Sequence, residues 1–485
     1  MKHTRRRLAV LASSAVFALP ATLASGAEPG GEKRSTLADQ RAIAVTIYND
    51  DLALVKEVRR VVLDAGLNQL AVRDVSARMQ PETALLRGIT SPEGLRLVEQ
   101  NFDFDLLTPE KLLEKNVGRT VGIVKTHPTT GQETVVRGEV LSAQDGVVLR
   151  VGDRIETGVP GRLVFDGVPN DLRDRPTLAV LLDSKSGGQQ DIELSYLSAG
   201  LSWRADYVVE LSANDDSVDL AGWVTLANAS GTTYRNARLQ LVAGDVNRVE
   251  KAVAKRKHES RGLLSANENF ADITEQSLFE YHLYTLERPT TLADKQTKQV
   301  ALLNASGVTA RKELVLNGHR HYYGGSYGEL GEKLKLDVML EFENREQSRL
   351  GMPLPKGTVR VYKRDAKGDA QFVGEDRIDH TPRNETVRLK LGQAFDVTAD
   401  RKQTEYNRKR SLTSGYVSES GYEIVLKNAK KEPVTIVVRE PIGGDWKMLQ
   451  ESHPHEKLSA GIAQWRLTIP PEGQTTLRYR VSVRY

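Results

Sequence analysis

The clearest match to a catalytic motif in the sequence is a G-x-S-x-G pattern. Residues Gly324–Gly328 read GGSYG, which puts Ser326 where a hydrolase would carry its nucleophile. That chemistry needs the serine on a sharp turn between a strand and a helix, whose N-terminus helps to stabilise an oxyanion. The flanking residues here instead predict two strands of a hairpin. We therefore interpret the motif as a glycine-rich turn, with a nucleophilic Ser326 as the alternative.

Two His-x-His pairs are the candidate metal ligands: His319 with His321, and His453 with His455. On a strand, residues i and i+2 point to the same face, so each pair could offer two imidazoles to zinc or copper. A metal site needs a third ligand, and each pair has only a single glutamate nearby. Solvated loop histidines are the favoured interpretation, and we expect no metal or other cofactor.

Three tyrosines beside the glycine-rich turn are the candidate binding residues. We expect Tyr322, Tyr323 and Tyr327 to be exposed at the tip of the hairpin, where tyrosine is a common contact residue. The sequence contains no phosphate-binding loop, dinucleotide fingerprint or H-E-x-x-H zinc motif. It also contains no cysteine, which excludes cysteine nucleophiles, thiolate metal sites and disulfides.

The first 27 residues predict a cleavable signal peptide. Four basic residues precede an apolar stretch, Leu8–Leu19, and small residues then favour a cut between Ala27 and Glu28. The stretch is shorter than the roughly 20 residues of a membrane-spanning helix, so we expect no transmembrane segment in the mature chain. The leader also fits a twin-arginine signal, and the export route stays open. We expect a periplasmic or secreted protein.

Net charge argues against a nucleic-acid partner. The chain has 68 Lys and Arg against 64 Asp and Glu, and residues 1–27 hold four basic and no acidic residues. Subtracting them leaves 64 of each sign in the mature chain. Nucleic-acid binding would need a surplus or a clustered stripe of positive charge.

Short strands separated by Gly, Asp and Pro turns predict a mainly β fold that positions these residues. We expect antiparallel β-sandwich modules, immunoglobulin-like at the C-terminus, a small inserted barrel of SH3 size, and few short helices such as one starting at Thr108. The predicted parts are a flexible N-terminus (28–40), a β-meander (41–116), the inserted barrel (117–170), a central β domain (171–332) with a mobile loop (248–276), and a C-terminal β-sandwich (333–485).

Six stretches carry a resemblance to a known family: Val45–Val55, Leu197–Tyr207, Gly222–Gly231, Leu241–Val246, Tyr281–Thr291 and Glu440–Trp446. Together they resemble the bacterial domain-of-unknown-function 4139 proteins, which are exported and distantly similar to mucoidy inhibitor A. The resemblance runs from about residue 43 to the end and implies a β-rich envelope protein, with no catalytic residues to carry over. Relatives of mucoidy inhibitor A often have a long helical segment where this chain has its barrel-like section.

We therefore expect an exported envelope protein, most simply a non-catalytic interaction or structural protein that binds a protein or glycan partner. The alternative is a periplasmic hydrolase or metal-dependent enzyme that uses His319 and His321, or Ser326. The sequence leaves the oligomeric state open.

Overall fold

The computed structural model describes residues 31–49, 51–103, 107–144, 146–159, 161–169, 172–244, 246–247, 273–410 and 415–485. These residues form 30 strands, one α-helix and five short 3₁₀ helices, which confirms the mainly β prediction. None of their helices is long and apolar enough to cross a membrane. The predicted signal peptide and residues 248–272 of the predicted loop lie outside the described residues. The last four residues of that loop, 273–276, begin strand β17.

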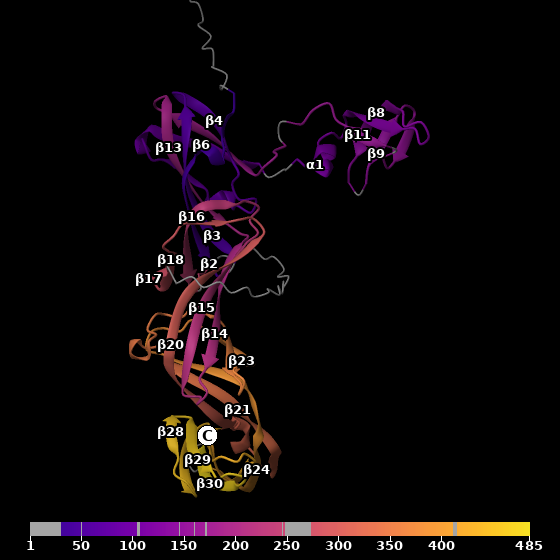
Figure 1. Cartoon of the computed structure of the whole chain (residues 1–485). Helices are drawn as coiled ribbons and strands as arrows, with labels where there is room; N and C mark the ends of the chain where they lie inside the picture. The colour runs from indigo at the N-terminus through magenta and orange to yellow at the C-terminus, as the bar shows by residue number, and fades with distance from the viewer. Residues whose placement is uncertain are drawn as a thin grey trace, which may run out of the picture.

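The N-terminal part of the described chain is a set of antiparallel hairpins with one added parallel strand (Figure 1). The segment predicted to be flexible contains strand β1, which pairs in parallel with Leu70–Val72 of β4. Thr36 then caps a 3₁₀ turn through a capping box with Asp39. These contacts order the described part of the segment. The strands are β1 (Lys33–Ser35), β2 (Gln40–Tyr48), β3 (Leu52–Leu63), β4 (Gly66–Arg73), β5 (Leu85–Gly88), β6 (Leu95–Asp103), β12 (Thr177–Ser184) and β13 (Gly188–Ser198).

A small domain is inserted between β6 and β12 and projects as a side arm (Figure 1). Its helix α1 (Pro109–Glu114) starts where predicted, because the Thr108 side chain accepts a hydrogen bond from the Lys111 N–H at 3.2 Å. Its sheet has the order β10-β9-β8-β7-β11, with β10 and β11 at opposite edges of the described sheet. The described sheet is therefore open between these two edges, so the small inserted section does not close into a barrel. The strands are β7 (Thr120–Thr126), β8 (Glu133–Ser142), β9 (Val148–Val151), β10 (Arg154–Thr157) and β11 (Arg162–Val164).

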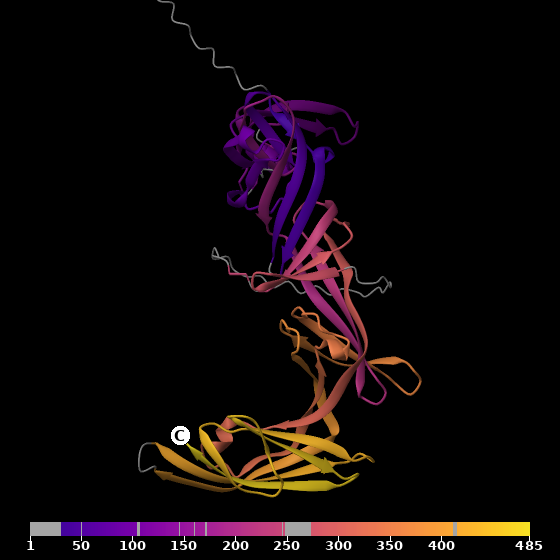
Figure 2. The same ribbon diagram turned by 90° about the vertical axis from the view of Figure 1, so that its left-hand side faces the viewer.

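The rest of the chain is an elongated series of β-sandwiches in which single strands serve two modules (Figures 1 and 2). The longest strands, β20 and β24, have 22 and 25 residues and pair with β21 in one thirteen-stranded sheet. The strands of the first and middle sandwiches are β14 (Leu201–Leu211), β15 (Ser217–Asn228), β16 (Tyr234–Ala243), β17 (Ile273–Leu278), β18 (Tyr281–Leu286), β19 (Thr290–Leu292), β20 (Gln296–Asn317), β21 (Glu329–Glu343), β22 (Gly357–Arg364) and β23 (Ala370–Ile378). Those of the last sandwich are β24 (Thr386–Arg410), β25 (Tyr416–Asn428), β26 (Val434–Pro441), β27 (Asp445–Glu451), β28 (Glu456–Ser459), β29 (Ile462–Ile469) and β30 (Gln474–Arg484).

A crossover with a buried asparagine occurs three times, at Asn228, Asn344 and Asn428. In each case a strand ends at or beside the asparagine, and the next strand pairs in parallel with an earlier one: β16 with β2, β22 with β14, and β26 with β20. Each side-chain amide donates to carbonyls of its own loop and of a second loop, at 2.8–3.5 Å. The three sandwiches therefore share one structural device, a repeat that the sequence analysis did not find.

Besides the small core of the inserted domain, the described residues form two hydrophobic cores, and these meet elsewhere than at the predicted boundary at residue 333. Leu340 and Leu389 belong to the core of the first and middle sandwiches, while Leu316 and Leu336 belong to the core of the last. The change from one core to the other occurs partway along β20, β21 and β24. A boundary between domains at residue 333 is therefore wrong, because continuous strands pass from one core to the other.

Candidate functional site

The turn that follows β20 buries two of the three predicted contact tyrosines. Residues Arg320–Tyr323 form a 3₁₀ turn that bends the chain over the last sandwich, so that Tyr322 is 8% exposed and Tyr323 is fully buried. The Tyr323 hydroxyl donates to the Glu440 carboxylate at 2.9 Å. Tyr327 is 47% exposed. The expectation of an exposed tip is therefore wrong for Tyr322 and Tyr323, and the exposed ring is that of Tyr327.

Beneath this turn lies a buried ion pair between Arg401 and Glu440. Their side chains are 1% and 0% exposed, and Arg401 donates to the carboxylate at 2.7 Å. Burial raises the pKa of Glu440, and the charge of Arg401 opposes that rise. Gly318 lies so close to the carboxylate that any side chain there would collide with it. Because this pair has no access to solvent, we assign it a structural role.

On the surface near the ion pair, His319 and His321 pack against Tyr322, and Tyr327 packs against His321; we call the three exposed residues His319, His321 and Tyr327 the aromatic tip. The two histidine rings stack with centroids 5.5 Å apart. His321 lies 4.6 Å from the ring of Tyr322 and 5.8 Å from that of Tyr327, with both pairs edge-on. The sequence suggested the histidines as metal ligands and Tyr327 as a contact residue, in two separate candidate sites, whereas the structure brings them together.

Strand β24 holds the aromatic tip in place. The Gln403 side chain accepts a hydrogen bond from the Tyr327 N–H at 2.7 Å and donates to the carbonyls of Tyr322 and Gly325. The Tyr406 hydroxyl donates to the Gly324 carbonyl at 3.2 Å. These four contacts all involve backbone groups, and they tie the backbone of the glycine-rich turn to β24.

Ser326 lies exposed on this turn. It is preceded by the 3₁₀ turn and followed by strand β21, whereas a nucleophile elbow has a strand before the serine and a helix after it. Within the described ranges, no hydrogen bond joins Ser326 to a histidine or a carboxylate. The motif is therefore a turn, as its composition indicates.

The second histidine pair lies apart from the tip, on the connection between β27 and β28. The imidazole of His455 contacts Glu451 at 2.9 Å and lies between the rings of Trp446 and Trp465. His453 interacts with the neighbouring serine. In the part of the chain that the structure describes, no three His, Asp or Glu side chains are grouped so that they could hold a metal ion.

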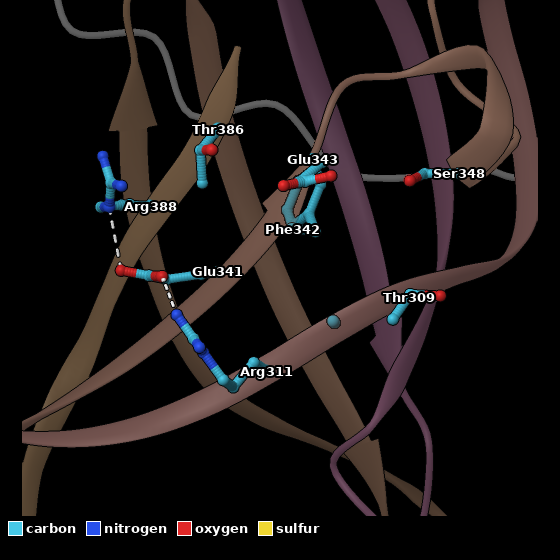
Figure 3. A pocket seen from close by; sticks show the side chains of 9 residues that line it. Thr309, Arg311, Glu341, Phe342, Glu343, Ser348, Thr386 and Arg388 are labelled. Atoms are coloured by element: carbon cyan, nitrogen blue, oxygen red, sulfur yellow. Dashed lines mark hydrogen bonds and ion pairs between the residues drawn. The ribbon is translucent and has the colours of Figure 1, made fainter. Parts of the chain in front are cut away.

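A pocket of about 380 Å³ opens where the middle and last sandwiches meet, and we call it the arginine pocket (Figure 3). The Glu341 carboxylate lies between Arg311, which donates at 3.0 Å, and Arg388, which donates at 2.9 Å. Burial tends to raise the pKa of Glu341, but the two arginines lower it below its ordinary value. The labelled lining residues are Thr309, Arg311, Glu341, Phe342, Glu343, Ser348, Thr386 and Arg388.

The pocket's charges continue into the neighbouring strands through Glu313. This buried carboxylate accepts hydrogen bonds from Arg439 at 2.9 Å and Arg466 at 2.8 Å, and Arg311 lies 3.2 Å from it. The sequence analysis missed this network. The available signal was the alternation of Arg311 and Glu313 among the apolar residues of a strand, but strand pairing was needed to bring Glu341 beside them.

Comparison with known proteins gives one positive result. No match was found among curated proteins. The family described as "Domain of unknown function (DUF4139)" matches residues 192–485, which covers all three crossovers, the aromatic tip and the arginine pocket. The chain therefore belongs to this family, as the resemblance of its sequence predicted.

Proposed function

We propose that this protein is exported to the bacterial envelope and acts there as a non-catalytic β-sandwich protein that binds a protein or glycan partner. Export rests on the signal-peptide pattern of residues 1–27. The observation that supports binding is the aromatic tip, because its exposed rings are held on a turn that the strands beneath already fix.

A fixed aromatic surface favours binding for two reasons. The rings offer a large apolar face with polar groups at the edge, which suits both protein side chains and sugars. Gln403 and Tyr406 hold the backbone of the turn, and the His321 ring packs against Tyr322, so association has little of the turn left to order.

The elongated shape supports the same role. Strands β20 and β21 run from the arginine pocket to the residues beside the tip, and they pair with each other and with β24 (Figure 2). A binding surface built on long paired strands is kept at a fixed position relative to the other modules, as a linking or presenting protein requires.

The test compares binding by the mature chain and by Tyr327→Ala. Binding to purified peptidoglycan would detect a glycan partner. Photo-cross-linking from position 326 in living cells would detect a protein partner. We expect Tyr327→Ala to weaken the dominant interaction by about tenfold, roughly the loss of one well-placed aromatic contact. Phe372→Ala is the matched control, because that ring is 55% exposed on edge strand β23, outside the tip.

Two results would overturn the proposal. One is an absence of both glycan binding and a specific cross-link. The other is hydrolytic activity that depends on bound zinc or copper and is lost in His321→Ala, which would favour the enzyme alternative.

A further inference from the structure

We propose that the arginine pocket is a second binding site and takes the glutamate or aspartate side chain of an acidic peptide segment. This inference is independent of the aromatic tip, since the two sites share no residue. It rests on the fixed geometry of the arginines, on their excess over the carboxylates, and on donors that are left unused.

The arginines are ordered before any ligand arrives. Arg311 and Arg388 have side chains that are 58% and 57% exposed, yet both are anchored to Glu341, whose side chain is 7% exposed (Figure 3). A surface arginine ordinarily loses considerable rotamer freedom when it is bound. Here the buried carboxylate already restricts that freedom, so a ligand meets a preorganised surface.

The network carries more positive than negative charge. Four arginines (Arg311, Arg388, Arg439 and Arg466) surround two buried carboxylates, those of Glu313 and Glu341. A third carboxylate lines the pocket, but it has its own counter-charge at 3.5 Å, because Glu343 faces Arg345. The network as a whole therefore has two more arginines than buried carboxylates, and Arg311 and Arg388 are the arginines that line the pocket.

Several hydrogen-bond donors that line the pocket have no partner among the described residues. Arg388 uses only its Nε on Glu341, so neither of its terminal nitrogens has a partner among the described residues. The hydroxyls of Thr309, Ser348 and Thr386, which also line the pocket, make no hydrogen bond within the described chain. A planar guanidinium with neighbouring hydroxyls suits an acceptor with two oxygens.

The chain itself shows which acceptor fits. The same guanidiniums already bind two glutamate carboxylates, at 2.8–3.2 Å. The pocket's own Glu341 and Glu343 would repel a doubly charged phosphate more strongly than a singly charged carboxylate. A third carboxylate of the same kind, carried by a partner's peptide, is the group that these observations favour.

The test uses the mature protein and a fluorescent peptide of alternating glutamate and glycine, with its glutamine analogue as the uncharged counterpart. We expect the glutamate peptide to bind in a salt-dependent manner and the glutamine peptide to bind at least about tenfold more weakly. Arg388→Lys keeps the charge opposite Glu341 but removes the planar fork, and Thr386→Val leaves every charge in place. Both should weaken binding, Arg388→Lys by about tenfold.

Arg364→Lys is the matched control, since Arg364 is also 58% exposed and also binds a glutamate, but lies outside the pocket. Tyr327→Ala should bind the peptide normally, which separates this site from the aromatic tip. Thermal unfolding of every variant verifies folding. Equal binding of both peptides, an equal effect of Arg364→Lys and Arg388→Lys, or no binding by the wild type would overturn the proposal. Tighter binding of inorganic phosphate or glucuronate at the same residues would overturn the assignment to a peptide.

Discussion

At the scale of single residues, the most demanding feature is the ion pair between Arg401 and Glu440. Two charged side chains with almost no exposure cost desolvation energy, and their mutual attraction together with the Tyr323 hydroxyl offsets that cost. One guanidinium nitrogen, the Nε of Arg401, has no partner among the described residues. This pair lies directly beneath the turn that carries the aromatic tip, so its integrity supports the tip's position.

We predict that Arg401→Met destabilises the fold by about 3–5 kcal/mol at neutral pH, because it leaves a buried carboxylate without its counter-charge. Burial would then raise the pKa of Glu440 further above the value in the unfolded chain, because the largest opposing effect, the charge of Arg401, is gone. Such a group favours the folded state at low pH, and the advantage is lost as the pH rises through the folded-state pKa. Urea unfolding should therefore show that Arg401→Met lowers the free energy of unfolding, relative to the wild type, by more at pH 8 than at pH 5.

The double variant Arg401→Met with Glu440→Gln provides the control. It removes both charges and keeps a side chain that can accept from Tyr323, so it should be more stable at pH 8 than Arg401→Met alone. A double variant that is no more stable than the single variant at pH 8 would argue against this account.

At the scale of elements, the three crossovers show how the sandwiches are joined. Each buried asparagine uses its amide to satisfy carbonyls of two loops and its oxygen to accept from a backbone N–H, for example that of Gly351 at 3.0 Å for Asn344. Buried backbone groups need partners. One short amide side chain therefore fixes the point at which the chain changes sheets.

We predict that Asn228→Ala, Asn344→Ala and Asn428→Ala each lower the free energy of unfolding by at least about 1–3 kcal/mol, the cost of leaving a buried polar group without a partner. Urea unfolding followed by circular dichroism would measure it. Asn407→Ala is the control, because Asn407 is exposed on β24. A crossover variant that is no less stable than this control would contradict the shared role.

Strand β21 and the crossover asparagines show what a local sequence pattern leaves undetermined. The alternation of apolar and polar residues over 336–342 indicated a strand with one buried and one wet face; the strand is present in β21, but Glu341 is buried between Leu340 and Phe342. It did not indicate where the strand passes from one core to the next, since each segment of a long strand follows the same local pattern. The repeated asparagine was visible in the sequence, but one residue in each of three divergent segments is too weak a signal without the hydrogen bonds.

At the scale of the whole molecule, the inserted arm is separate from the body in both core and sheet (Figure 1). The strands on either side of it pair directly, with Asp103 opposite Thr177. The chain therefore leaves and re-enters the body at nearly the same point, as a tolerated insertion does.

We predict that replacing residues 104–171 by a short glycine–serine linker leaves the body folded. Residues 172–176 are retained, because Arg173 and Arg175 pair with Glu32 and Asp74 of the body at 2.6 Å. The thermal midpoint of the body should change by no more than about 3 °C, equivalent to about 1 kcal/mol in domains of a few hundred residues. Binding to the acidic peptide should be unchanged. Insoluble protein, or loss of the body's unfolding transition, would contradict the separation.

The sequence by itself determined the features that depend on neighbouring residues. These are the β class from alternation, the start of α1 from Thr108 and Pro109, the turn at Gly324–Gly328, and the family. Only the tertiary structure decided which tyrosines are buried, that the inserted sheet is open, and that four arginines surround two glutamates. Strand pairing within one sheet brings together residues as distant as Glu313 and Arg466, and a period of two along one strand specifies a face but not the strand that lies beside it.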